Sequence, residues 1–216
     1  MIRIVLADDH PGFRAGVRAR LDREPDLEVV GEADSGTEAL ELAATLRPDV
    51  LVLDIEMPGA TGVDVLAEIG TADGAPAILV LSGYDDAAYA FAALDRGAAG
   101  YLTKHEPLAA VVEAVRGVST GEMGWLSRRI AAHVQRRGPV AQDAAAAAGL
   151  SPRERDVLDL LAQGLRNDAI GEQLFISEST VKKHVHALYG KVGVPTRAAA
   201  VAWAWRNGLV EADPKF

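Results

Sequence analysis

Short apolar runs alternate with helix-like stretches along the first 120 residues, and this alternation restricts the fold more than any other feature of the sequence. Five runs predict buried strands: residues 2–7, 28–31, 50–53, 77–81 and 100–102. A helix is expected after each, because apolar residues recur there every three or four positions. This pattern is typical of a parallel sheet with helices on both faces. We therefore expect an α/β domain with the flavodoxin-like strand order 2-1-3-4-5.

The third run, Val50–Leu53, is followed directly by a carboxylate, Asp54, and the chain then turns at Pro58 and Gly59. Four consecutive apolar residues predict a strand that is buried on both faces, as in parallel sheets. Open α/β sheets bind their ligands at the carboxyl ends of the strands. We therefore predict that Asp54 is chemically modified and that the rest of the chain detects the modification.

The two halves of the chain differ in charge, and the net charge is −9. Residues 1–120 hold 9 Lys and Arg against 21 Asp and Glu, whereas residues 179–210 hold five basic residues and no acidic one. This division predicts two domains with different partners. The lack of cysteine excludes disulfides, thiolate metal sites and a cysteine nucleophile. Because neither a signal peptide nor a long apolar run is recognisable, we expect a cytoplasmic protein with no membrane partner.

The chain is expected to form three segments: an α/β domain over 1–121, a partly helical linker over 122–148 and a small all-α domain over 149–216. The all-α domain should contain four helices. Ser151 and Glu154 are spaced as a capping box at the start of the first one. The third helix is expected over 178–191 and the fourth over 196–205, because apolar residues recur at helical spacing there.

Polar side chains follow four of the predicted strands: Asp8 and Asp9, Asp54, Ser82 and Lys104. These four strands are neighbours in the expected order, so the side chains should converge at one edge of the sheet. Carboxylates that lie so close need a cation. With oxygen ligands alone, Mg²⁺ is the natural choice. The site suits phosphoryl transfer onto Asp54, after which Lys104 and Ser82 would bind the phosphate.

These motifs, together with Met57-Pro58, Gly62 and the run 97–104, resemble a bacterial response-regulator receiver domain over residues 1 to about 120. The resemblance implies that a sensor histidine kinase phosphorylates Asp54. It implies Mg²⁺ ligands from four residues: Asp8 (mainly through water), Asp9, Asp54 and the backbone carbonyl of Glu56. It also implies a phosphate-sensing switch made of Ser82, Tyr101 and Lys104. Glu56 and Tyr84 occupy positions that tune the phosphate lifetime in this family.

Three runs in the all-α part, residues 150–158, 176–184 and 191–194, resemble a LuxR-type helix-turn-helix. A receiver joined to this domain is typical of the NarL/FixJ-type response regulators of two-component systems. The resemblance implies a transcription regulator rather than an enzyme, with covalent chemistry limited to phosphorylation and dephosphorylation of its own receiver. Three positions in the second helix depart from the usual pattern: Arg166, Asp168 and Gly171.

By this resemblance, the helix over 178–191 enters the major groove of DNA. The expected DNA contacts are Ser179, Thr180, Lys182, Lys183, His186 and Lys191. The fourth helix resembles the dimerisation helix of the family, with contacts expected at Ala199, Val201 and Ala202. The implied partners are a cognate kinase, double-stranded DNA with a two-fold related site, RNA polymerase, and a second copy of the chain after phosphorylation. Phosphorylation would free the DNA-binding domain, favour dimerisation, or do both.

Three rival functions were weighed: a nucleotide-using enzyme, a hydrolase, and a DNA-binding protein that does not depend on phosphorylation. The turn Asp8-Asp9-His10-Pro11-Gly12 lacks a glycine-rich cradle, and its acids repel phosphate, which argues against the first. A hydrolase needs a general acid, for which His10 is the one candidate, and we assign His10 no catalytic role. The complete set of acids, serine and lysine argues against the third function but leaves it open.

Overall fold

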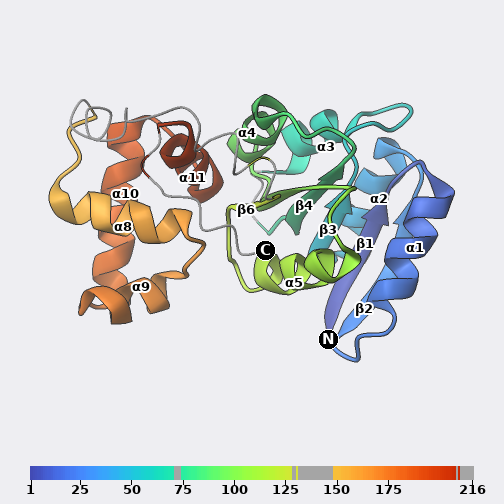
Figure 1. Ribbon diagram of the computed structural model, residues 1–216, viewed down its shortest axis with the longest axis horizontal. Helices are drawn as coiled ribbons and strands as arrows, with labels where there is room; N and C mark the ends of the chain where they lie inside the picture. Colours follow the sequence, from blue (N-terminus) through green and yellow to red (C-terminus); the bar gives the residue numbers. More distant parts are fainter. Residues whose placement is uncertain (71–73, 128–129, 131–147, 208, 210–216) are drawn as a thin grey trace.

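The computed structural model describes residues 1–70, 74–127, 130, 148–207 and 209. The arginines expected in the linker (Arg128, Arg129, Arg136 and Arg137) and most of its alanine run lie outside the described residues. Figure 1 shows an α/β domain at one end of the molecule and a smaller helical domain at the other. Within the described part of the chain, no helix is both long and apolar enough to cross a membrane.

The described residues contain six strands, which form one parallel sheet in the order β2-β1-β3-β4-β5-β6. The strands are β1 (Ile2–Ala7), β2 (Leu27–Ala33), β3 (Val50–Leu53), β4 (Ala77–Ser82), β5 (Gly100–Thr103) and β6 (Trp125–Leu126). The order of the first five confirms the prediction. The sixth lies in the segment expected to be linker, where Trp125 pairs with Gly100 and Leu126 with Tyr101. A two-residue strand gives no periodic signal, so the sequence did not reveal it.

Helices cover both faces of the sheet, as the strand–helix alternation predicted (Figure 1). They are α1 (Pro11–Leu21), α2 (Gly36–Leu46), α3 (Gly62–Ile69), α4 (Ala87–Asp95) and α5 (Leu108–Ser119). Alternate residues of β1 and β3 point to opposite sides. Ile4 and Val52 pack with α1 and α5, whereas Val5 and Leu51 pack in the core that includes α2, α3 and α4. Every residue of β3 is buried, as expected for a central parallel strand.

The helical domain consists, in the described residues, of α8 (Pro152–Ala162), α9 (Asn167–Leu174), α10 (Glu178–Val192) and α11 (Arg197–Arg206). Ser151 and Glu154 form the predicted capping box on α8. Arg166 stands at the N-cap of α9 without a side-chain capping bond. The glycine at position 171 has a steric explanation, since a Cβ there would lie 2.8 Å from the carbonyl oxygen of Ile176.

The two domains meet where α11 packs against α4. Seven of the ten residues of α11 are buried, including the stretch Ala198–Ala202. Arg206 donates a hydrogen bond to Asp95 at the end of α4, and its guanidinium lies 6.0 Å from the centre of the Phe91 ring. The loop before β6 also contributes, because a Cβ on Gly124 would lie 2.7 Å from Cγ1 of Val201. The surface of the α/β domain at α4 therefore covers one side of the predicted dimerisation helix.

Candidate functional site

Asp54 is held at the carboxyl end of β3 by the chain around it. Its backbone N–H donates to the carbonyl of Ala7 over 2.8 Å, which ties the ends of β3 and β1 together. The following loop returns so closely that a Cβ on Gly62 would lie 2.1 Å from the Asp54 carbonyl oxygen. The Asp54 side chain is buried, and so are those of Asp8 and Ser82. The strand ends therefore bring the predicted polar groups to one edge of the sheet.

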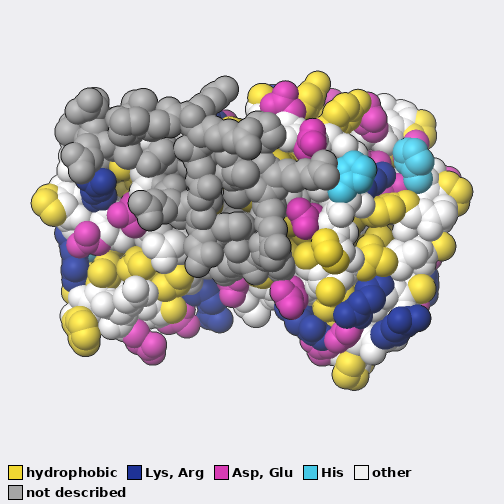
Figure 2. Space-filling model, viewed as in Figure 1, with side chains coloured by type: hydrophobic (Ala, Val, Ile, Leu, Met, Phe, Trp, Pro, Cys, Tyr) yellow, Lys and Arg dark blue, Asp and Glu magenta, His cyan; other side chains and the backbone are white. Residues whose placement is uncertain are grey.

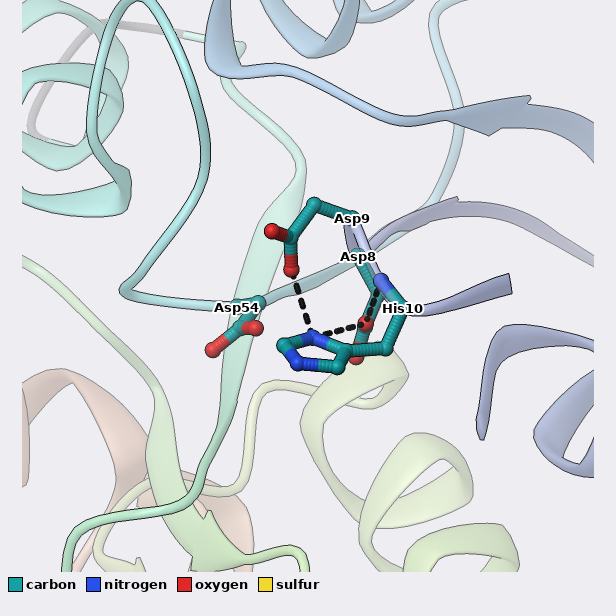
Figure 3. A group of neighbouring side chains, drawn as sticks. All are labelled: Asp8, Asp9, His10 and Asp54. Carbon is teal, nitrogen blue, oxygen red and sulfur yellow. Dashed lines mark hydrogen bonds and ion pairs between the residues drawn. The ribbon is translucent and has the colours of Figure 1, made fainter. Parts of the chain in front are cut away.

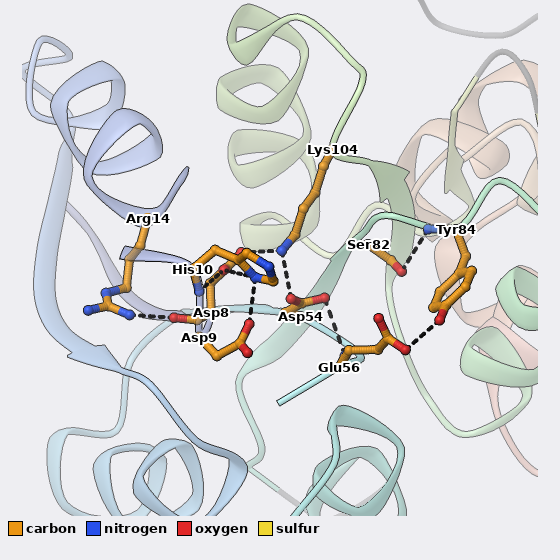
Figure 4. A network of polar contacts seen from close by, with 9 residues as sticks. All are labelled: Asp8, Asp9, His10, Arg14, Asp54, Glu56, Ser82, Tyr84 and Lys104. Carbon is orange, nitrogen blue, oxygen red and sulfur yellow. Dashed lines mark hydrogen bonds and ion pairs between the residues drawn. The ribbon is translucent and has the colours of Figure 1, made fainter. Parts of the chain in front are cut away.

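Lys104 joins two of the carboxylates (Figure 4). Its Nζ lies 2.6 Å from Oδ2 of Asp54 and 2.8 Å from Oδ2 of Asp8. Burial raises the pKa of the Asp54 carboxyl, and the hydrogen bond from Lys104 partly offsets the rise. Burial would lower the pKa of Lys104, but its bonds to both carboxylates outweigh this effect and raise it. The Lys104 ammonium therefore pairs with Oδ2 of both Asp54 and Asp8. The Oδ1 atom of each carboxylate makes neither of these bonds and can approach a further positive group.

Carboxylate oxygens of three acids, with one imidazole nitrogen, are grouped as metal ligands would be (Figure 3). One ligand atom from each of Asp8, Asp9, His10 and Asp54 lies within 4.8 Å of the others. Three of the four residues offer carboxylate oxygens, the donors that a hard divalent cation such as Mg²⁺ prefers. The donor set therefore fits the cation that the sequence predicted. His10 also contacts this group, with Nδ1 2.6 Å from Oδ1 of Asp9.

Two of the predicted switch residues, Ser82 and Tyr101, are linked through the backbone of Tyr84. Ser82 Oγ accepts a hydrogen bond from the Tyr84 N–H over 3.2 Å. The Tyr101 side chain is fully buried, and its hydroxyl donates to the Tyr84 carbonyl over 3.1 Å. Burial raises the pKa of Tyr101. A movement of Ser82 toward Asp54 would thus release the N–H of Tyr84, the residue whose carbonyl accepts the hydrogen bond from Tyr101.

The side chain of Tyr84 reaches back to the acidic site. Its hydroxyl donates to Oε1 of Glu56 (Figure 4), and this bond raises the pKa of Tyr84. The Tyr84 ring stacks on Tyr89 of α4, with 5.2 Å between the ring centres. Sequence reasoning identified Glu56 and Tyr84 separately but missed the bond between them and the backbone links, since backbone contacts have no signature in residue type.

The predicted DNA-contacting residues lie on α10. Ser179, Lys182, Lys183, His186 and Lys191 are exposed and Thr180 is half-buried, while Val181, Val185 and Leu188 face the core of the domain. Lys191 also donates to Oε2 of Glu154 over 2.6 Å. That bond is the main cause that lowers the pKa of Glu154 to about 2. The sequence indicated a capping role for Glu154 but not this ion pair.

The predicted dimer contacts lie on the other side of the helical domain. Ala199, Val201 and Ala202 are at most 2 % exposed. Val201 and Ala202 belong to an apolar cluster that includes residues of α4 and α8. The face of α10 and the buried face of α11 are therefore separate surfaces. One is open to solvent and the other is covered.

Two family models match the chain. That of the response regulator receiver domain matches residues 4–116, and that of the bacterial regulatory proteins of the luxR family matches residues 148–204. The probable transcriptional regulatory protein NarL of Mycobacterium tuberculosis is 41% identical over 97% of this chain and 96% of its own length. The transcriptional regulatory protein LiaR of Bacillus subtilis is 37% identical over 97% of this chain and 100% of its own length.

Among solved structures, the response regulator ChrA of a heme-sensing two-component system is 37% identical, with a TM-score of 0.52. The match covers 96% of this chain and 98% of ChrA. The receiver domain of NarL from Mycobacterium tuberculosis is 41% identical, with a TM-score of 0.54, over 56% of this chain and 97% of that domain. NarL, LiaR and ChrA thus match this chain across both of its domains, in the same order.

Proposed function

Because this chain belongs to the transcriptional response regulators that join a receiver to a LuxR-type DNA-binding domain, we propose that Asp54 is its phospho-acceptor. The supporting observation is the bridge that Lys104 makes between Asp54 and Asp8 at the buried strand ends. A carboxylate held there beside a fixed ammonium can act as a nucleophile toward phosphorus, with Lys104 ready to pair with the product. A sensor histidine kinase is the proposed donor of the phosphoryl group.

A divalent cation, Mg²⁺ by the chemistry of the donors, would be held at the same place. Asp9, Asp54 and the Glu56 carbonyl would bind it directly, and Asp8 mainly through water. The cation would supply positive charge to the phosphoryl oxygens. The protein's own part is to keep the carboxylate buried, to exclude bulk water and to hold Lys104 in place. The sole reaction proposed for the chain is the gain and loss of this phosphoryl group.

The readout is proposed to begin at Ser82. Phosphorylation adds roughly −1.5 to −2 charges at Asp54, to which the Ser82 hydroxyl and Lys104 are attracted. Ser82 then releases the N–H of Tyr84, whose carbonyl and ring hold Tyr101 and Tyr89. Tyr89 belongs to α4, so the local change reaches the helix that covers α11. Complete switching from about 1:99 to 99:1 needs ~5.5 kcal/mol of differential stabilisation.

The covered face of α11 indicates which activity is controlled. Ala199, Val201 and Ala202 are buried in a helix that packs on α4 and α8, whereas Lys182 and Lys183 on α10 are exposed. We propose that phosphorylation releases α11 and so permits a homodimer. Two copies of α10 then read a DNA site with two-fold symmetry, at half-sites about one helical turn apart. RNA polymerase is the expected downstream partner, and the site of action is the cytoplasm.

Acetyl phosphate with Mg²⁺, followed by intact mass spectrometry, tests the phospho-acceptor. The parent chain should gain one phosphoryl group, and Asp54→Asn should gain none. Asp64→Asn is the matched control, because this acid caps α3 at the surface and should leave labelling unchanged. Labelling of the Asp54→Asn protein at the parent rate would overturn the proposal.

A further inference from the structure

His10 lies within the acidic site, although no role was assigned to it from the sequence. Figure 3 draws its imidazole beside the carboxylates of Asp9 and Asp54, and Figure 4 shows the same group from another direction. Nδ1 is 2.6 Å from Oδ1 of Asp9 and 3.6 Å from Oδ1 of Asp8. The ring is thus placed among the oxygens to which a divalent cation would bind.

The distance between His10 and Asp9 is too short for both to bind one cation as they stand. Neighbouring ligands of an octahedral Mg²⁺, each about 2.1 Å from the ion, lie about 3 Å apart. Mg²⁺ also prefers oxygen to imidazole nitrogen. A cation that binds Oδ1 of Asp9 would therefore have to displace the ring, which can move outward because 66 % of the side chain is exposed. Exposed histidine side chains are visible on the receiver in Figure 2.

We propose that His10 and the divalent cation exclude each other at Asp9, so that His10 raises the cation concentration needed to fill the site. This inference rests on the cation site proposed above. His10 acts here as a positioning residue: its ring occupies the space beside Oδ1 of Asp9 until a cation takes its place. The contact is largely exposed and contributes little, so the competition should weaken cation binding by about two- to fivefold.

A Mg²⁺ titration of the full chain at fixed pH, followed by backbone amide NMR shifts near Asp54, tests the competition. The variant is His10→Ala, which removes no capping bond, since the His10 side chain makes none at the start of α1. His105→Ala is the control, because His105 is an exposed imidazole next to Lys104 in the chain. His10→Ala should bind Mg²⁺ about two- to fivefold more tightly than the parent, and His105→Ala should match the parent.

Equal or weaker binding by His10→Ala would overturn the proposal, and weaker binding would identify His10 as a ligand instead. A second readout uses the parent protein alone, so it does not depend on how the variant folds. The ring signals of His10 should move toward those of a solvent-exposed histidine as Mg²⁺ is added, and unchanged signals would contradict the exchange. If neither the parent nor the variants bind Mg²⁺, the cation site itself is wrong, which is a distinguishable failure.

Discussion

Arg206, near the end of the chain, donates a hydrogen bond to Asp95 of α4, 111 positions earlier in the sequence. This bond lies at the edge of the contact between α4 and α11, and the Arg206 guanidinium also lies over Phe91. The two charged side chains are each 36 % exposed. The pair therefore closes the rim of a contact whose centre is apolar, and it offers a way to weaken that contact without disturbing either core.

Asp95→Ala should raise self-association of the unphosphorylated chain. Loss of a half-exposed ion pair costs about 0.2–1 kcal/mol, which corresponds to a shift of up to about fivefold toward the open form. Sedimentation equilibrium measures the dimerisation constant. Arg96→Ala is the control, since the Arg96 side chain donates to the Ala92 carbonyl of α4 itself. The same dimerisation constant in Asp95→Ala and the parent would show that the pair does not restrain the domains.

The bond between Tyr84 and Glu56 should control how long the phosphoryl group persists. Tyr84→Phe and Glu56→Gln each remove or weaken this bond, so each should change the rate of phosphoryl loss. Because both act on one contact, the double variant should change the rate no more than the larger single change. Decay of radiolabelled phosphoprotein gives the three rates. Effects that simply add on a logarithmic scale would mean that the two side chains act independently.

The ion pair between Glu154 and Lys191 should make the stability of the helical domain depend on pH. The folded pKa of Glu154, about 2, is below its ordinary value of 4.5, so the pair stabilises the fold above pH 4.5. Because Lys191 is 39 % exposed and solvent screens the pair, this contribution is about 1 kcal/mol, and it is lost as the pH falls from about 4.5 to about 2. Urea unfolding of the parent and Glu154→Gln should differ at pH 6 and converge toward about pH 2. A difference that is constant over this range would contradict the assignment.

Gly62 should be required for the geometry of the phospho-acceptor. A Cβ there would lie 2.1 Å from the Asp54 carbonyl and 2.8 Å from Cα of Ile55, so Gly62→Ala must displace the backbone that carries Asp54. Labelling by acetyl phosphate should fall by tenfold or more, because small displacements of reacting groups are costly. Gly12→Ala is the matched control, since no atom lies within 4 Å of a Cβ at that position. Normal labelling of Gly62→Ala would show that the loop adapts freely.

Local patterns in the sequence predicted the sheet and most of the site. The apolar runs gave five strands in the correct order, and the acids at their ends, with Lys104, meet as expected. The contact between α4 and α11 could not be predicted in the same way. Small residues of α11 occupy most sides of the helix, so its sequence indicates a helix but no particular packing partner. The link from Ser82 through the backbone of Tyr84 to Tyr101 was also missed, because it depends on peptide groups that every residue carries.

The most direct test of the account asks whether α11 must leave α4 before the chain can dimerise. Gly124→Cys with Val201→Cys would tie α11 to the loop before β6, and so hold it on the receiver, since a Cβ on Gly124 lies 2.7 Å from Val201 Cγ1. The chain has no other cysteine, so a single disulfide can form. Light scattering then measures the mass of the variant with Mg²⁺ and beryllofluoride, an analogue of the phosphoryl group. The account predicts a monomer while the disulfide is intact and a dimer after its reduction. Equal dimerisation of the oxidised and reduced forms would contradict it.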